Sequence, residues 1–480
     1  MAISPYALRT VATVSASAVV LAGALVPVAN AQSSDGLNFP SSSLSSTPGQ
    51  DNQEGTGGPK NIIYMVGDGM GYNHVAAANL YESGQTRYQV EGEAAPEQLE
   101  ELEGEAVQVY EGDDWNHLAM ATFQEGNSYD GLRAWSDHNY VNEDFTDSAA
   151  AGTAMATGGK TSNGSLGVSS DGEAMENTSE RAKAQGKAAG VVSDVPFSHA
   201  TPAAWAAHNA DRNDYHAIAD EMLAGDLDVI MGAGHPLYGV DNELLAEPNY
   251  RYISEEGFTA ASTGETDFEY FEEDAAFEAL ANGEVEEGTQ YFGLAQVAST
   301  LQHDRTGASA VPYDVEQNDV IDLATMSEGA LNALNTDDDG FHLMIEGGAI
   351  DWAGHANDIA RDIEEVQAFN DTVDVVVEWV EENSSWDETL LIVTADHETG
   401  YLSGQDELPG WKALHGGAGE VPEHEYYSGN HTNQVVPFFY KGAGSEDIAA
   451  NVAGTDPVRG DYIDNTTVAN LTFNEWWNED

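Results

Sequence analysis

The chain has 480 residues, of which 41% are hydrophobic, enough for one large domain or roughly two or three ordinary ones. Its formal net charge of −69 argues against nucleic acid or an anionic membrane as a partner, because such a chain would repel both. The absence of cysteine excludes disulfides and thiol chemistry. Nine Trp, twenty Tyr and fourteen Phe favour a packed protein over a disordered one. We interpret the acidic surface as an adaptation to high salt, in which dense carboxylates are screened.

Residues 1–31 have the pattern of a secretory signal peptide. Arg9 precedes an apolar run over 11–28, and Ala29-Asn30-Ala31 forms a small-residue cleavage site. The pattern predicts an exported protein, periplasmic or secreted, without a membrane span, because no later stretch is long and apolar enough. Residues 32–59 are rich in Ser, Gly, Pro, Asn and Gln and are predicted to be a flexible leader to a large domain over 60–480.

Apolar runs alternate with helical patterns along this domain. Strands are predicted at 62–66, 188–193, 229–231, 341–345, 390–393 and 435–440. Helices are predicted at 146–156, 203–208 and 356–381. The alternation predicts an α/β fold, with a mostly parallel central sheet covered by helices on both faces. Acidic surface insertions are expected near 81–130, 240–300 and 400–428.

The stretch from Glu346 to His355 carries three metal-binding types of side chain. Glu346 follows the predicted strand at 341–345, and the two glycines after it allow the backbone to turn sharply. Asp351 and His355 are four residues apart, so on a helix they would share a face and could bind one ion. The alternative is a capped helix start with an exposed histidine.

Further possible ligands also lie next to predicted strands. They are Asp68 after 62–66, His199 and Thr201 after 188–193, Asp396 and His397 after 390–393, and His431 before 435–440. In open α/β sheets ligands bind beyond the carboxyl ends of the strands, so the fold would gather these side chains. Imidazole with carboxylate suits zinc, whereas the oxygen ligands of Asp68, Thr201 and Glu346 suit magnesium.

Ser148 opens a predicted helix of small residues. A helix N-terminus carries partial positive charge and free N–H groups, so it favours an alkoxide or a phosphate. Arg212 offers a planar, bidentate fork for phosphoryl oxygens. Taken singly, Ser148 would more often be only a helix cap and Arg212 only a surface ion pair. With two metal ions, however, the combination predicts hydrolysis through a covalent seryl intermediate.

Six motifs, in order between about residues 60 and 442, resemble those of the bacterial alkaline phosphatases. They are Asp68-Gly-Met-Gly71, Thr146-Asp-Ser148-Ala-Ala150, His199-Ala-Thr201-Pro-Ala-Ala204 with the later Arg212, Glu346 to His355, Ala395-Asp-His-Glu-Thr-Gly400 and Asn430-His431-Thr432. The resemblance implies that 60–480 is a phosphatase domain that hydrolyses small phosphate monoesters at alkaline pH and releases inorganic phosphate. It also implies a homodimer.

The resemblance further implies a role for each motif residue. Ser148 would be the nucleophile that becomes phosphoserine, and Arg212 would bind the phosphate. One zinc ion, which activates water and takes the leaving oxygen, would be held by Asp351, His355 and His431. A second zinc ion, which activates Ser148, would be held by Asp68, Asp396 and His397 together with Ser148. A third ion, usually magnesium, would be held by Asp68, Thr201 and Glu346.

Two residues depart from the enterobacterial pattern, and a marine, cold-active branch of the family is similar at both. His199 stands where the enterobacterial enzyme has Asp, and Trp352 where it has Lys. A neutral imidazole holds hydrated magnesium less well than a carboxylate, so His199 is either a ligand of the third ion or a neighbour of its ligands. Trp352 either lines the phosphate site or only packs; without the lysine charge we expect a weaker hold on product phosphate.

Two other functions fit parts of the pattern. A phosphodiesterase or sulfatase of the same superfamily would use a Thr or a modified Cys as its nucleophile, and Cys is absent. A secreted, non-catalytic protein that binds metal or phosphate would not need Ser148 beside a complete set of ligands.

Overall fold

The computed structural model describes residues 58–405 and 410–478. The predicted signal peptide and all but the last two residues of the predicted leader lie outside the described residues. Within the described part of the chain, no helix combines the length and the apolarity needed to cross a membrane.

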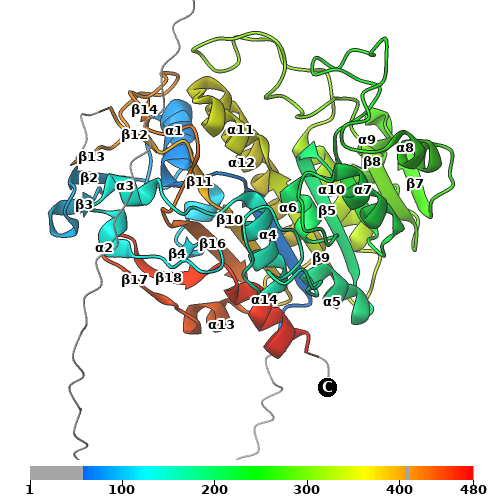
Figure 1. Ribbon diagram of the computed structural model, residues 1–480, viewed down its shortest axis with the longest axis horizontal. Coiled ribbons are helices and arrows are strands. Elements are labelled where there is room, and N and C mark those ends of the chain that lie inside the picture. Colours follow the sequence, from blue (N-terminus) through cyan, green and yellow to red (C-terminus); the bar gives the residue numbers. More distant parts are fainter. Residues whose placement is uncertain (1–57, 406–409, 479–480) are drawn as a thin grey trace, which may run out of the picture. The chain divides into compact units, whose positions relative to one another are not determined.

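An eleven-stranded sheet positions the rest of the described chain (Figure 1). Its strands are, in spatial order, β17 (Gly454–Asp456), β18 (Gly460–Asp464), β4 (Asn116–Ala121), β16 (Val436–Gly442), β10 (Thr389–Thr394), β1 (Asn61–Gly67), β9 (Phe341–Gly347), β5 (Ala188–Pro196), β6 (Val229–Ala233), β8 (Gln290–Leu294) and β7 (Phe268–Phe271). From β10 to β7 every pair is parallel, whereas β16 runs antiparallel to both neighbours. Strands β1, β5, β9 and β10 are buried along their whole length, as expected of parallel strands covered on both faces.

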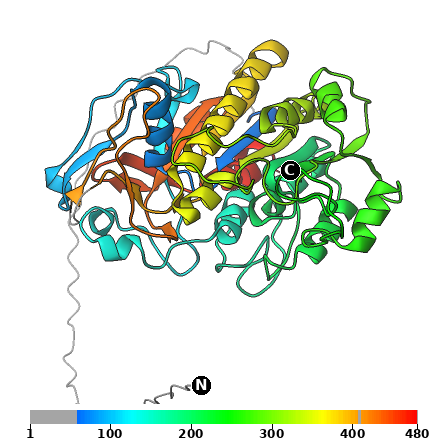
Figure 2. The ribbon, with the colours of Figure 1, turned by 90° about the horizontal axis from the view of Figure 1, so that it is seen from above.

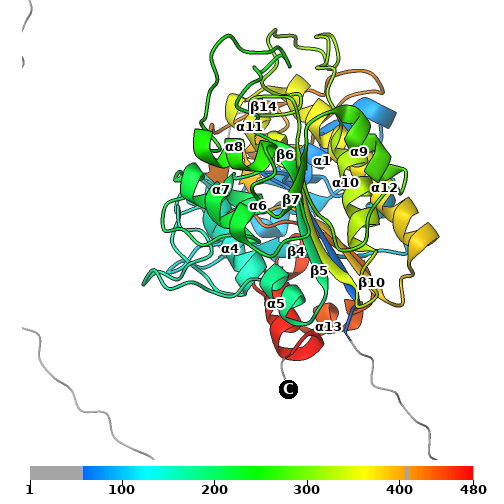
Figure 3. The same ribbon diagram turned by 90° about the vertical axis from the view of Figure 1, so that its right-hand side faces the viewer.

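Helices cover both faces of the sheet, which Figure 3 shows nearly edge-on. One face carries α1 (Tyr72–Ser83), α9 (Asp274–Ala281), α10 (Leu323–Leu334) and α12 (Ile359–Asn383). The other carries α4 (Ser148–Thr157), α5 (Thr178–Ala184), α6 (Ala200–Ala204), α7 (Tyr215–Ala224) and α14 (Thr467–Leu471). Helix α12 is the longest and runs beside α1, as Figure 2 shows. The predicted α/β class and the mostly parallel sheet are therefore confirmed.

The described chain also contains shorter elements, among them the 3₁₀ helices η1 (Pro96–Gln98) and η2 (Val109–Glu111) and the π-helix η3 (Thr472–Trp476). The α-helices among them are α2 (Gly131–Ala134), α3 (His138–Val141), α8 (Glu255–Ser262), α11 (Ala349–Ala356) and α13 (Ser445–Ala450). Three small sheets join β11 (Glu398–Thr399) to β15 (His431–Thr432), β12 (Leu402–Ser403) to β14 (Glu425–Tyr426), and β13 (Gly410–Trp411) to β2 (Val90–Glu93) and β3 (Leu99–Glu101).

Three sequence predictions differ from this fold. The helix predicted at 203–208 is instead α6, which ends at Ala204. The helix predicted at 356–381 begins only at Ile359, because Asn357 is left-handed (φ 54°) and ends α11, and the Asp358 side chain caps α12. The acidic segments 81–130 and 240–300 contribute β4, β7 and β8 to the central sheet, so they are not surface insertions throughout. Their acidic composition concealed these short strands.

Phe369 anchors α12 to the sheet and offers a test of this packing. Its ring is fully buried and lies against Gly347 at the end of β9. We expect Phe369→Ala to lower the free energy of unfolding by about 3–5 kcal/mol through the cavity it leaves. Urea unfolding followed by circular dichroism measures this. Glu378→Ala, at an exposed position of the same helix, is the matched control and should change stability little.

Candidate active site

The side chains predicted to bind metal meet at the carboxyl edge of the parallel strands. Strands β1, β9 and β10 end in register, since Val66 pairs with both Glu346 and Thr394. Asp68 and Asp396 therefore leave the sheet beside Glu346. Because β16 is antiparallel, it starts at the edge where β10 ends, and the segment before it brings His431 there. The pairing of Thr399 with His431 in the β11–β15 ladder fixes that approach.

One group of possible ligands comprises Asp68, Asp396 and His397, all fully or almost fully buried. Nε2 of His397 lies 3.1 Å from Asp396 Oδ2 and 3.5 Å from Asp68 Oδ1. The backbone N–H of Gly69 donates to Asp396 Oδ1 over 3.0 Å. Gly69 is left-handed (φ 73°), and a Cβ there would lie 2.9 Å from the Cα of Asp351. Only glycine therefore lets this turn approach the second group so closely.

The second group comprises Asp351, His397 and His431, with His355 at its side. Helix α11 does place Asp351 and His355 on one face, as predicted: His355 Nε2 lies 3.4 Å from Asp351 Oδ1. His431 Nε2 lies 3.4 Å from the same oxygen, and its Nδ1 faces the Thr146 carbonyl at 2.8 Å. Burial raises the pKa of Asp351, but the imidazoles of His431, His355 and His397 outweigh it and hold that pKa well below its usual value.

Glu346 and Thr201 lie on the other side of Asp68. The Thr201 hydroxyl donates to Asp68 Oδ2 over 3.2 Å, and the Ser193 hydroxyl donates to Glu346 Oε2. His199 is placed differently: its ring lies 5.7 Å from that of Trp352 and 6.2 Å from that of Tyr215. Burial lowers the pKa of His199 to about 3, which keeps the imidazole neutral.

Buried carboxyl oxygens without a partner show that this edge suits cations. Among the residues that the structure describes, Asp68 Oδ1 and Glu346 Oε1 are buried and accept no hydrogen bond. Burial raises the pKa of Glu346 to about 8, and burial together with Asp396 and Asp351 raises that of Asp68 well above its ordinary value. A bound cation would keep these groups ionised and would occupy the unpaired oxygens. The imidazole–carboxylate groups fit zinc, and the oxygen set around Asp68, Thr201 and Glu346 fits magnesium.

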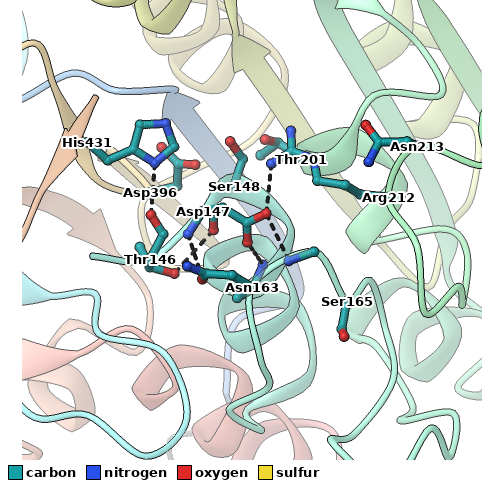
Figure 4. Close-up of polar contacts among 12 residues, drawn as sticks. Thr146, Asp147, Ser148, Asn163, Ser165, Thr201, Arg212, Asn213, Asp396 and His431 are labelled. Atoms are coloured by element: carbon teal, nitrogen blue, oxygen red, sulfur yellow. Dashed lines mark hydrogen bonds and ion pairs between the residues drawn. The ribbon is translucent and has the colours of Figure 1, made fainter. Parts of the chain in front are cut away.

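Ser148 and Arg212 lie beside these groups at the N-terminus of α4. Ser148 is 2% exposed, and its Oγ lies 3.3 Å from His397 Nε2. Asp147 caps the helix through Oδ1, which accepts from the Ala150 N–H, while its Oδ2 accepts from Arg212 Nη1 over 3.0 Å. Figure 4 shows Ser148 between Asp396 and His431 on one side and Thr201 and Arg212 on the other. Burial lowers the pKa of Arg212, but Asp147 more than compensates, so the guanidinium stays charged.

These side chains open into one pocket of about 610 Å³. Its lining includes Phe145, Ser148, His199, Arg212, His303 and Trp352. Pockets of this size accommodate small organic molecules, so there is room for more than a phosphate group.

Two residues of the motif Ala395 to Gly400, to which the sequence assigned no role, support the ligands. Thr399 donates from Oγ1 to Asp351 Oδ1 over 2.6 Å and lies 3.2 Å from His397 Nδ1, so it contacts both groups. Glu398 accepts from Thr432 Oγ1 over 2.6 Å, which ties the segment after β10 to that before β16. Both follow Asp396-His397 directly within that motif, but the sequence does not show which groups their side chains contact.

The alkaline phosphatase family model matches residues 59–248 and 305–436, more than half of the chain. The protein therefore belongs to the alkaline phosphatase family, which confirms the family assigned by resemblance.

Individual relatives agree with this assignment. Alkaline phosphatase 4 of Bacillus subtilis is 29% identical over 361 residues, which are 74% of this chain and 65% of that relative. Alkaline phosphatase of Escherichia coli is 28% identical over 371 residues, 70% of each chain. Among solved structures, the cold-active alkaline phosphatase of the psychrophile Shewanella sp. has a TM-score of 0.59 and 25% identity, covering 85% of this chain and 98% of that one. Alkaline phosphatase from the Antarctic bacterium TAB5 has the same fold, with a TM-score of 0.60, 21% identity, and coverage of 88% and 100%.

Thr399 provides a test of the metal centre. We expect Thr399→Val, which keeps the shape but removes the hydroxyl, to lower the affinity for zinc about 10- to 100-fold, because such supporting hydrogen bonds orient the ligands. Titration of the metal-free protein with zinc in a competing chelator measures the affinity. Thr372→Val, a buried change in α12 that removes a hydroxyl which donates to the Ala368 carbonyl, should leave the zinc affinity unchanged. If Thr399→Val and Thr372→Val bound zinc with equal affinity, Thr399 would not support the metal ligands.

Proposed function

We propose that the protein hydrolyses phosphate monoesters at alkaline pH through a phosphoserine at Ser148 and releases inorganic phosphate. One observation carries the proposal: a buried serine hydroxyl at a helix N-terminus lies 3.3 Å from an imidazole of the ligand groups and beside a half-buried arginine, Arg212. Membership of the alkaline phosphatase family supports it.

Two zinc ions and one magnesium ion are proposed as cofactors. One zinc ion would be held by Asp351, His355 and His431, the other by Asp68, Asp396, His397 and Ser148, and the magnesium ion by Asp68, Thr201 and Glu346. His199, whose ring lies against Trp352, would contact this third site from the side rather than as a strong ligand. Bound zinc supplies positive charge that activates a hydroxyl or water and stabilises the leaving oxygen.

The side chains of the chain itself would perform the remaining work. Ser148 Oγ attacks phosphorus, so that an O–P bond forms while the ester P–O bond breaks and the alcohol leaves with a proton. Water then attacks the phosphoserine, which frees Ser148 and releases phosphate. Arg212 binds two phosphoryl oxygens in both steps, and Asp147 holds its guanidinium at the N-terminus of α4. Trp352 would line the phosphate site without adding charge. Product phosphate would therefore be held less tightly than by an enzyme with Lys at this position.

The setting of the enzyme is also proposed from its sequence. Residues 1–31 would direct export to the periplasm or the medium, and the parts of 81–130, 240–300 and 400–428 that lie outside the central sheet would add acidic surface. The active form would be a homodimer, adapted to high salt.

Replacement of the nucleophile tests the reaction. Ser148→Ala should lower turnover of an aryl phosphate at least about a thousandfold, since loss of a covalent nucleophile removes the main route. Bound zinc, measured by elemental analysis, should remain. Ser165→Ala, a nearby serine with no proposed role, should keep its activity. The wild-type enzyme should cleave an aryl phosphate far faster than a bis-aryl phosphodiester or an aryl sulfate; the reverse order would refute a phosphomonoesterase.

A salt series tests the role of the acidic surface. The chain has 84 Asp and Glu against 15 Lys and Arg, so self-repulsion opposes the folded state at low ionic strength. Raising salt from about 0.1 M to about 1 M shortens the Debye length from about 10 Å to about 3 Å. We expect both the melting temperature and kcat/KM to rise over this range, because screening also helps the anionic substrate to approach. A flat or falling response in both would show that the surface is not a salt adaptation.

A further inference from the structure

His303 is a pocket residue outside the motifs of the family. It lines the same pocket as Ser148 and Arg212. It belongs to residues 249–304, the internal stretch that the family model leaves unmatched. The roles proposed for Ser148, Arg212 and the metal ligands therefore do not include His303.

The imidazole of His303 is held in one orientation. Its Nδ1 lies 3.1 Å from Asp304 Oδ1. Asp304 is itself fixed, since its Oδ2 accepts from Ser299 Oγ over 2.5 Å and its N–H donates to Thr300 Oγ1 over 2.8 Å. A carboxylate at Nδ1 places the proton on that nitrogen, so Nε2 of the neutral ring is left as a hydrogen-bond acceptor.

The next residue anchors this segment to the fold. Arg305 is 3% exposed and pairs with Glu364 Oε2 of α12 at 2.5 Å. Its guanidinium also donates to the carbonyls of Gln302, Val315 and Glu316, at 2.9, 3.3 and 3.1 Å. A chain with only 15 Lys and Arg thus uses one of them to fix the backbone beside His303. Arg305 thus anchors the segment to α12, whereas His303 is the residue that lines the pocket.

The pocket wall beside His303 is formed by Trp352, while the two carboxylates that line the pocket, Asp147 and Asp351, are already paired with Arg212 and with imidazoles. The His303 ring lies edge-on to Trp352, with the centroids 6.4 Å apart, and Phe145 also lines the pocket. Among the lining side chains that the structure describes, Arg212 is the only Lys or Arg. The pocket therefore offers one strong phosphate anchor and, away from it, flat apolar faces with a fixed acceptor. Such a surface suits the face of a ring that carries hydroxyl donors, and it offers little to a second phosphate.

We propose that His303 and Trp352 bind the alcohol part of the substrate and select phosphate monoesters of hydroxylated rings, such as nucleoside 5′-monophosphates and hexose phosphates. His303 Nε2 accepts a hydrogen bond from a ring hydroxyl, while Trp352 packs against the ring. This inference rests on the proposed phosphomonoesterase activity and adds its substrate class.

Two pairs of substrates, which differ in the hydroxyl groups on the ring, test the hydrogen bond to His303. The first is adenosine 5′-monophosphate against its 2′,3′-dideoxy analogue, and the second is glucose 6-phosphate against cyclohexylmethyl phosphate. The holoenzyme, His303→Ala and the exposed control His415→Ala are compared by kcat/KM on all four. We expect His303→Ala to reduce the preference for the hydroxylated member about three- to tenfold, the value of one ordinary hydrogen bond, in at least one pair. His415→Ala should keep the wild-type preference.

A second variant tests the orientation of the ring. Asp304→Asn retains the size of the side chain but removes the charge that holds the proton on Nδ1, so it should also reduce the preference while activity on cyclohexylmethyl phosphate persists. If His303→Ala slows all four substrates equally, or none, the inference is overturned while the phosphomonoesterase stands. If the wild-type enzyme cleaves none of them and no aryl phosphate, the proposed function and this inference both fail.

Discussion

Buried negative charge at one edge of the sheet is the constraint on which the site depends. Asp68, Glu346, Asp351 and Asp396 are at most 6% exposed, and burial together with the other three carboxylates raises the pKa of Asp68 well above its ordinary value. Carboxylates at such a position are stable only when cations and hydrogen-bond donors surround them. The surrounding imidazoles, hydroxyl groups and backbone N–H groups stabilise part of this negative charge. The carboxyl oxygens of the described residues that lack a partner, such as Asp68 Oδ1 and Glu346 Oε1, indicate where metal ions fit.

Strand direction explains how the ligands converge. The parallel strands β1, β9 and β10 end together, so residues hundreds of positions apart leave the sheet as neighbours. The antiparallel strand β16 adds the one ligand that precedes its strand, His431. Glycine at position 69 then allows the turn after β1 to approach helix α11 within a distance that any side chain would block.

The few basic residues are distributed unlike the acidic ones. Arg212 is paired with the helix cap Asp147 beside the nucleophile, and Arg305 and Arg361 are both paired with the buried Glu364. Acidic residues are instead abundant and mostly exposed, as in the segment 97–105. The protein thus combines a surface whose repulsion salt can screen with short-range charge pairs inside, which salt affects far less.

The sequence alone determined the α/β class, the family and most of the residues that meet at the site. Apolar runs indicate buried strands. A metal-binding type of side chain that directly follows such a run lies at the edge of the sheet, however the helices pack on its faces. Only the tertiary structure decided that His355 and His431 both approach Asp351 Oδ1, and that His199 lies against Trp352. It also decided that Thr399 contacts both ligand groups and that His303 lines the pocket. It also placed β4, β7 and β8 in the sheet, although their segments read as acidic surface. These facts depend on contacts between distant segments, which neither local spacing nor composition encodes.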